Sequence, residues 1–184
     1  MILSDRDIMH LIELKRLVIE PFDPSIVREN GVDLRLGREF CRLRRTLTRV
    51  LDSRSPPPDI DEWYRCEEVD EERGFVIYPH EHVLAHTMEW LELPDDLVGL
   101  VNVRSTFARL GLYIPPTVVD AGFKGQLVIE IIGSEFPIRV YPGQRFLHLI
   151  LAKASSPVAR PYTGKYQGQK GVQLPKPDAG RPQV

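Results

Sequence analysis

Cysteine is scarce in this sequence, and the two cysteines present show no recognisable pattern. Cys41 and Cys66 are the only cysteines among 184 residues, and they form no CxxC pair. Small secreted domains that depend on disulfides carry many more cysteines at close spacing. We therefore expect no disulfide framework, two thiols that nothing pairs or activates, and a reducing, cytoplasmic environment.

Long apolar runs and an excess of charge are absent as well. No segment approaches the ~20 apolar residues of a membrane span, and the opening MILSDRDIMHLIE places acids where a signal peptide would be basic. The 24 basic and 26 acidic residues give a net charge of -2, which leaves no general footprint for nucleic acid. We expect a soluble protein without a membrane or nucleic-acid partner, in which any anion site is local.

The length favours one domain spanning residues 1–184, because 184 residues can build one full core and are too few for two. Beyond Pro157 the composition shifts to Pro, Gly, Gln and Lys. This composition predicts a C-terminal tail over residues 157–184 that is mobile unless something orders it.

The pattern of apolar residues predicts one short helix followed by many strands. Ser4 is a suitable N-cap for a helix that continues to about Lys15. The segment 53–61 contains three consecutive prolines and predicts a surface loop. Short strands separated by turn residues predict a sandwich or barrel. These strands are expected at residues 17–22, 31–36, 75–78, 83–93, 98–103, 112–114, 127–132, 138–141 and 146–152.

Three histidines, His80, His82 and His86, lie close together in YPHEHVLAH. The zinc-protease pattern needs glutamate directly after the first of two histidines four apart, and here Val83 follows His82. The zinc nucleobase deaminases need a CxxC, which this chain does not contain. We therefore interpret these histidines as structural or surface residues and expect no zinc.

The run RSTFARLG at residues 104–111 has the composition of an anion site. Arg104 and Arg109 offer bidentate donors, and Ser105 and Thr106 add hydroxyls beside the backbone amides of a turn. The alternative is a polar strand end followed by an ordinary surface loop.

Asp120 precedes the segment AGFKG, which by itself indicates no single function. Its two glycines, Gly122 and Gly125, most simply mark a tight hairpin with Phe123 at the tip.

Glu130 is a lone carboxylate within an apolar strand, LVIEII. Side chains alternate between the faces of a strand, so Glu130 shares a face with Val128 and Ile132. An ionised carboxylate is costly to bury, and burial raises its pKa toward values that suit proton transfer. The glutamate is thus a candidate catalytic acid and base.

Several motifs occur here in one order: ILSDRDI (2–8), GVDLRLG (31–37), RSTFARLG (104–111), DAGFKGQLVIEI (120–131), YPGQR (141–145) and PYTGKYQGQKG (161–171). Together they resemble the dCTP deaminases of the dUTPase-like superfamily over most of the chain. The resemblance implies a mainly β fold, a distorted antiparallel β-barrel. It also implies a homotrimer with active sites between subunits and a tail that closes over the nucleotide.

The resemblance also implies roles for individual residues. It implies a catalytic set made of Glu130 with Ser105 and Arg109 of a neighbouring subunit, and magnesium bound through the substrate triphosphate rather than by protein side chains. The residues implied to bind nucleotide are Arg104, Ser105, Thr106, Phe107, Ala108, Arg109, Asp120, Val128, Ile129, Glu130, Tyr162, Lys165 and Gln169.

The sequence departs from the family pattern at His148, where many relatives carry glutamine, and we interpret His148 as a packed core histidine. Three functions remain open. They are a deaminase that converts dCTP to dUTP and ammonia, a bifunctional enzyme (or plain dUTPase) that produces dUMP and pyrophosphate, and a non-catalytic nucleotide-binding trimer. Glu130 argues against a plain dUTPase, because phosphate-ester hydrolysis needs no proton shuttle beside the base.

Overall fold

The computed structural model describes residues 1–44, 50 and 60–176. Most of the predicted loop at 53–61 lies outside the described residues. None of the helices in the described part of the chain has the length and apolarity needed to cross a membrane.

The predicted N-terminal helix is confirmed and is slightly shorter than expected. Helix α1 (Asp5–Glu13) begins after Ser4, whose hydroxyl accepts a hydrogen bond from the Asp7 N–H while the Asp7 carboxylate accepts one from the Ser4 N–H. This reciprocal capping satisfies donors that the first turn leaves unpaired. The helix buries Ile8 against the sheets.

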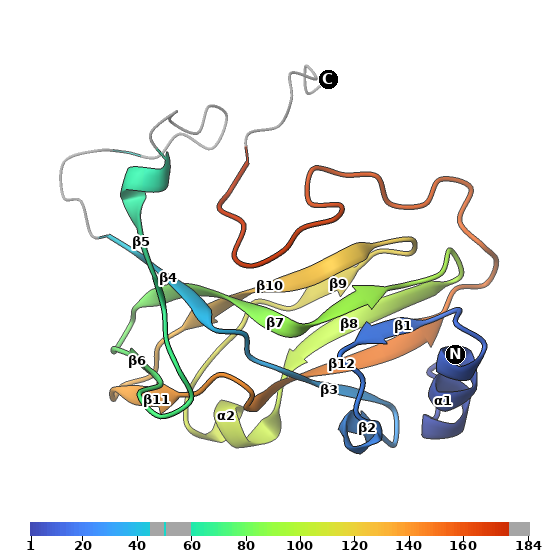
Figure 1. Ribbon diagram of the computed structural model, residues 1–184, viewed down its shortest axis with the longest axis horizontal. Helices are drawn as coiled ribbons and strands as arrows, with labels where there is room; N and C mark the ends of the chain where they lie inside the picture. The colour runs from blue at the N-terminus through green and yellow to red at the C-terminus, as the bar shows by residue number, and fades with distance from the viewer. Residues whose placement is uncertain (45–49, 51–59, 177–184) are drawn as a thin grey trace.

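Two five-stranded sheets and one two-stranded sheet make up the rest of the described fold (Figure 1), and every strand pair in them is antiparallel. One sheet has the order β2-β3-β12-β8-β9; the other has β1-β7-β4-β5, with β10 also paired to β7. The remaining elements are β6 and β11, which pair with each other, and the short helices η1, η2 and α2. The bounds are β1 (Val18–Glu20), η1 (Pro24–Ile26), β2 (Val27–Arg28), β3 (Gly31–Arg35), β4 (Glu39–Leu43), η2 (Ile60–Trp63), β5 (Tyr64–Glu68), β6 (Phe75–Ile77), β7 (His82–Glu92), β8 (Leu97–Val103), α2 (Ser105–Arg109), β9 (Thr117–Val119), β10 (Lys124–Ile132), β11 (Ile138–Val140) and β12 (Arg145–Lys153).

The mainly β, antiparallel architecture is therefore confirmed, and the hydrogen bonding among described residues does not close it into one continuous barrel. The main core lies where strands from different sheets turn their apolar faces together. Phe40 of β4 stacks on Phe75 of β6 with ring centroids 4.5 Å apart, and Phe107 of α2 contacts Phe146 of β12 at 4.6 Å. Such aromatic pairs join segments that are distant in sequence.

Two local predictions are wrong because pairing partners are not sequence neighbours. The segment around Gly122 is not a hairpin, since β9 pairs with β8 and β10 pairs with β7. Phe123, expected at the tip of that hairpin, is buried in the core. The expected strand at 112–114 is reduced to a single bridge between Tyr113 and Ile132.

The expectation of unpaired cysteines is also wrong, because Cys41 and Cys66 form a disulfide. Cys41 lies directly opposite Cys66 in the β4–β5 ladder, with their Cα atoms 3.9 Å apart. Both strands carry charged residues and little apolar alternation, so neither was predicted, and their pairing could not be inferred from cysteine spacing. Because the two cysteines are bonded to each other, they no longer support the expectation of a reducing compartment.

The first part of the predicted tail, residues 157–176, is fixed in place by contacts with the rest of the chain; we call it the strap. It follows β12 and returns along the edge of β10 (Figure 1). The backbone of Tyr162 donates to Ala121, that of Gly168 donates to Lys124, and Gly125 forms a parallel bridge with Gln169. The rest of the predicted tail, residues 177–184, lies outside the described residues.

Candidate active site

A cavity of about 430 Å³ lies between β10, β5, β7, β9 and the strap. This volume is within the range of small-molecule sites. Its residues are Tyr64, His82, Leu84, Val101, Thr117, Val118, Val119, Asp120, Phe123, Leu127, Val128, Glu130, Tyr162, Tyr166, Gln169, Gln173 and Pro175.

Glu130 is in the wall of this cavity. The alternation of β10 places Leu127, Ile129 and Ile131 in the core and leaves Glu130 half-buried on the opposite face. Burial raises the pKa of the Glu130 carboxyl, opposed in part by a hydrogen bond from its own backbone. The raised pKa expected from the sequence is confirmed.

Tyr64 and His82 belong to the same cavity, and sequence reasoning missed both. Burial, followed by the nearby Glu130 carboxylate and Tyr166, raises the pKa of the Tyr64 hydroxyl, which therefore stays a neutral donor. Burial lowers the pKa of His82, so its imidazole is neutral near pH 7. The position of His82 follows from cross-strand pairing. Leu84 opposes Glu130 and His82 opposes Ile132, so these side chains share one face of the sheet.

The Nδ1 atom of His82 is the one buried side-chain nitrogen or oxygen without a hydrogen-bond partner among the described residues. His82 was interpreted as structural or surface, and the structure places it in the wall of the candidate site.

Five of the residues that the family resemblance assigns to nucleotide binding line this cavity. Asp120, Val128 and Glu130 line the cavity from the β9–β10 region, and Tyr162 and Gln169 line it from the strap. The Tyr162 ring contacts Phe123, 5.8 Å between centroids, which ties the strap to the core beneath it.

Ile129 and Lys165, two further predicted residues, do not line the cavity. Ile129 points into the core and is buried. Lys165 lies on the strap, where its Nζ donates to the carbonyl oxygen of Lys176 at 2.8 Å.

The run predicted to bind phosphate forms α2, so the alternative of an ordinary surface loop is wrong, and α2 lies away from the cavity. Figure 1 shows α2 at the lower edge of the molecule and the strap at the upper edge. Phe107 is buried, whereas Ser105, Thr106, Ala108 and Arg109 are exposed to solvent. None of these residues lines the cavity that holds Glu130 within the same chain.

Arg104, at the N-terminus of α2, is held by a buried carboxylate. Its Nε lies 3.1 Å from Asp33 Oδ2, and its guanidinium also donates to the Arg145 carbonyl oxygen. The other Asp33 oxygen lies 3.0 Å from His148 Nδ1. The interpretation of His148 as a packed core residue is therefore wrong: it is half-buried and shares the Asp33 carboxylate with Arg104.

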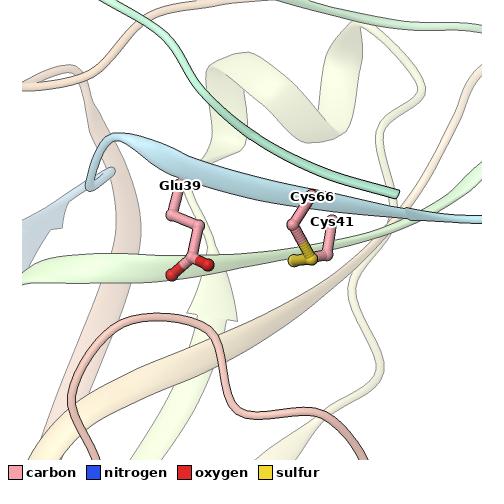
Figure 2. Close-up of side chains that lie close together, drawn as sticks. All are labelled: Glu39, Cys41 and Cys66. Carbon is pink, nitrogen blue, oxygen red and sulfur yellow. A yellow bond between two sulfur atoms is a disulfide. The ribbon is translucent and has the colours of Figure 1, made fainter. Parts of the chain in front are cut away.

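The described residues contain one group whose spacing could suit a metal ion, formed by Glu39, Cys41 and Cys66 (Figure 2). The two sulfur atoms are bonded to each other. Metal-binding cysteines are thiolates, so this group as it stands offers only the Glu39 carboxylate.

A β-sheet scaffold that holds a half-buried carboxylate with a raised pKa in a cavity of this size is typical of proteins that bind a small molecule. The model of a family described as dCTP deaminase-like matches residues 2–154, and the chain belongs to this family.

Curated relatives match along nearly the whole chain. The chain is 58% identical over 178 residues to a dCTP deaminase of Staphylothermus marinus, covering 97% of this chain and all of that protein. It is 62% identical over 178 residues to a dCTP deaminase of Desulfurococcus amylolyticus, covering 97% of this chain and 96% of that one. Among solved structures, the 2'-deoxycytidine 5'-triphosphate deaminase of Agrobacterium tumefaciens superimposes with a TM-score of 0.65 at 25% identity, over 82% of this chain and 46% of that one.

Proposed function

We propose that this protein deaminates dCTP to dUTP and ammonia, with Glu130 as the proton shuttle. The observation that carries the proposal is the half-buried Glu130 in a small-molecule cavity of a chain belonging to the dCTP deaminase-like family. Relatives named dCTP deaminase that are 58% and 62% identical along the chain support the choice of substrate.

The chemistry needs one group that can both accept and release protons. Water adds at carbon 4 of cytosine, one of its protons passes to ring nitrogen 3, and the other leaves on the ammonia. Glu130 takes the first proton from the water and gives it to ring nitrogen 3, then takes the second proton from the new hydroxyl on carbon 4 and gives it to the leaving amine. The raised pKa of Glu130 keeps it effective as an acid near neutral pH.

Ser105 and Arg109 complete this site from a neighbouring subunit of a homotrimer. Their exposure on α2, outside the Glu130 cavity of their own chain, supports this arrangement. Exposed apolar side chains on the β8–β9 pair also support an assembly: Leu100 and Val118 are paired across β8 and β9 and are 39% and 56% exposed. Their burial in an interface would stabilise the assembly.

The triphosphate is bound by Arg104 and Lys165, together with a magnesium ion that the phosphate oxygens would hold and that would neutralise their charge. Residues 157–184 act as a lid, and Tyr162 and Gln169 of the strap contact the nucleoside together with Asp120. Val128 lines the pyrimidine. We place the protein in the cytoplasm, where its substrate would be found.

A bifunctional enzyme is the second candidate, and one observation favours it. Asp120 is an exposed carboxylate in the same cavity as Glu130. It could position a second water against the α-phosphate, which would release dUMP and pyrophosphate.

Product analysis separates the candidates. The protein is incubated with dCTP and magnesium, and ammonia, dUTP, dUMP and pyrophosphate are resolved over time. Ammonia with accumulating dUTP is the expected result, and ammonia with dUMP identifies the bifunctional enzyme. Bound dCTP without any ammonia would refute deamination and leave the nucleotide-binding trimer.

A further inference from the structure

Gln126 of β10 makes three hydrogen bonds to the strap, and it takes no part in the chemistry proposed above. Its backbone N–H donates to the Gln169 carbonyl oxygen at 3.0 Å, and its own carbonyl oxygen accepts from Gln169 Nε2 at 2.7 Å. Its side-chain Oε1 accepts from the Gly171 N–H at 2.7 Å, and its Nε2 donates to the Met88 carbonyl oxygen. Gln126 thus fixes both the backbone and a side chain of the strap.

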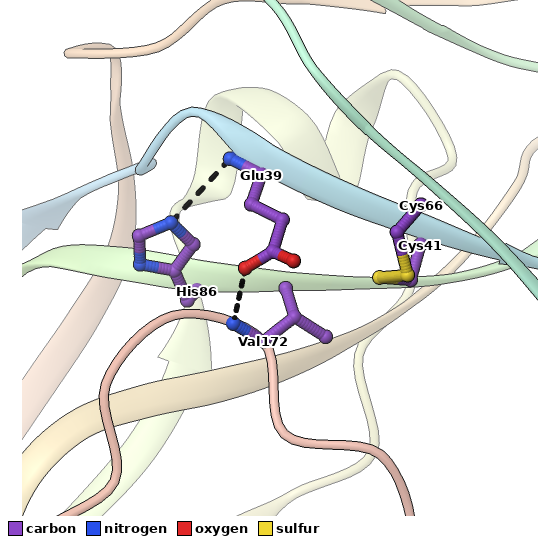
Figure 3. Close-up of a disulfide and its surroundings, with 5 residues drawn as sticks. All are labelled: Glu39, Cys41, Cys66, His86 and Val172. Atoms are coloured by element: carbon purple, nitrogen blue, oxygen red, sulfur yellow. Dashed lines mark hydrogen bonds between the residues drawn. A yellow bond between two sulfur atoms is a disulfide. The ribbon is translucent and has the colours of Figure 1, made fainter. Parts of the chain in front are cut away.

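Glu39 of β4 holds the strap one residue further on. Glu39 Oε2 accepts from the Val172 N–H at 2.8 Å (Figure 3). Hydrogen bonds to an ionised acceptor are roughly twice as strong as neutral ones. The Val172 side chain is buried in a cluster with Cys41, Trp63 and Leu84, so a hydrogen bond to a carboxylate and an apolar contact meet at one point of the strap.

The position of Glu39 is itself set by β7. The Glu39 N–H donates to His86 Nε2 at 3.4 Å, and His86 Nδ1 lies 2.8 Å from the Thr87 carbonyl oxygen. Both contacts are satisfied by the neutral tautomer that carries its proton on Nδ1. Burial lowers the pKa of His86, which favours this neutral form.

We propose that Glu39 and Gln126 are positioning residues, which hold residues 166–172 of the strap over the Glu130 cavity. Neither lines the cavity, whereas Tyr166, Gln169 and Gln173 do. Fixing these strap residues in advance lowers the conformational entropy lost when nucleotide binds. The proposal rests on the proposed function for its effect on dCTP, and on contacts within the chain for the anchoring itself.

A glycine of the strap fits this role. Gly171 has φ +64°, and a Cβ there would lie 2.7 Å from Glu39 Oε2. Gly168 has a similar φ of +75° but no atom within 4 Å of its Cβ position. A side chain at either glycine would strain the backbone, but only one at Gly171 would also collide with Glu39. Comparing substitutions at the two positions therefore isolates the effect of the Glu39 contact.

The first test is Glu39→Ala, with Glu39→Gln as the matched control. Loss of the acceptor should raise KM for dCTP about tenfold with a smaller change in kcat, and should speed tryptic cleavage after the exposed Lys165 and Lys170. Cleavage of a folded protein reports how often the segment opens. Glu39→Gln keeps an oxygen that can accept from Val172 and should recover most of both properties. Wild-type KM and wild-type cleavage in Glu39→Ala would overturn the proposal.

A second pair of variants avoids any change in charge. Gly171→Ala should raise KM and speed cleavage clearly more than Gly168→Ala, because only the former displaces Glu39. Equal effects of the two would count against the anchor. Cleavage needs no turnover: if wild type makes no ammonia, the proposed function fails, and faster cleavage of Glu39→Ala still supports the anchor.

Discussion

Glu130 combines two properties at the scale of a single residue. It opposes Leu84 in an apolar ladder, yet it opens onto a cavity with tyrosine and histidine neighbours. Burial raises the pKa of its carboxyl from an ordinary value of 4.5. A group that is costly to ionise in the folded state lowers stability, and this cost is the physical counterpart of its usefulness as an acid.

Glu130→Gln should therefore stabilise the fold in a pH-dependent way. Because the folded-state pKa lies above 4.5, wild type loses stability as pH rises from that value through the folded pKa. The variant lacks this loss, so it should be more stable than wild type at neutral pH and equal to it below pH 4.5. Thermal denaturation at several pH values measures the difference. An advantage that is the same at all pH values would show that packing, not ionisation, is responsible.

The partial burial and raised pKa of Glu130 could be predicted from the sequence, because strand alternation can be recognised from neighbouring residues alone. The roles of Tyr64 and His82 could not, since they reach the cavity through cross-strand pairing. The same holds for His148, where the Asp33 partner lies on β3, 115 residues away in sequence.

At the scale of elements, most apolar strands were predicted and the polar ones were missed. β4 and β5 carry arginines and glutamates, and each strand is only partly buried. Their sequences therefore lack the apolar alternation that indicates a strand. The supposed hairpin at Gly122 failed because each arm pairs with a distant strand. Local turn signals cannot report such pairing.

The β4–β5 disulfide should contribute measurably to stability. It joins residues 25 apart, and closing a loop of that length stabilises a folded chain by about 3 kcal/mol in the chain-entropy view. The variant with both Cys41→Ser and Cys66→Ser should lose about this amount in denaturant unfolding. Wild type treated with reductant should behave the same way, and a stability that reductant leaves unchanged would count against the bond.

Removal of the strap should separate function from folding. A chain that ends before Tyr162 loses the cavity wall formed by Tyr162, Tyr166 and Gln169, while the paired strands of all three sheets remain. We expect weaker dCTP binding and slower ammonia release with an unchanged β-type circular dichroism spectrum. An unfolded product would show that the strap is required for the fold.

At the scale of the whole molecule, the proposed catalytic groups lie in two places. Glu130 is in the cavity beneath the strap, and Ser105 and Arg109 are exposed on α2. The family resemblance indicates that these residues act together. Their separation within one chain could not be predicted, because it depends on how distant strands pair. An assembly with closed symmetry would join the two halves at every interface.

Mixing two inactive variants tests this arrangement. Glu130→Gln and Arg109→Ala should each be inactive alone. If each site takes Glu130 from one subunit and Arg109 from another, co-assembled subunits in equal amounts should regain about a quarter of the sites. The deaminase rate after joint refolding measures this recovery. No recovery in verified mixed assemblies would place both groups in the same subunit.

The central claim is that Glu130 transfers the protons in the deamination of dCTP. The most direct measurement is ammonia release from dCTP by wild type and by Glu130→Gln, with nucleotide binding measured on the same samples. Ammonia from wild type, and none from a variant that still binds dCTP, is the predicted result. Ammonia release by Glu130→Gln at the wild-type rate, or none from wild type, would contradict the claim.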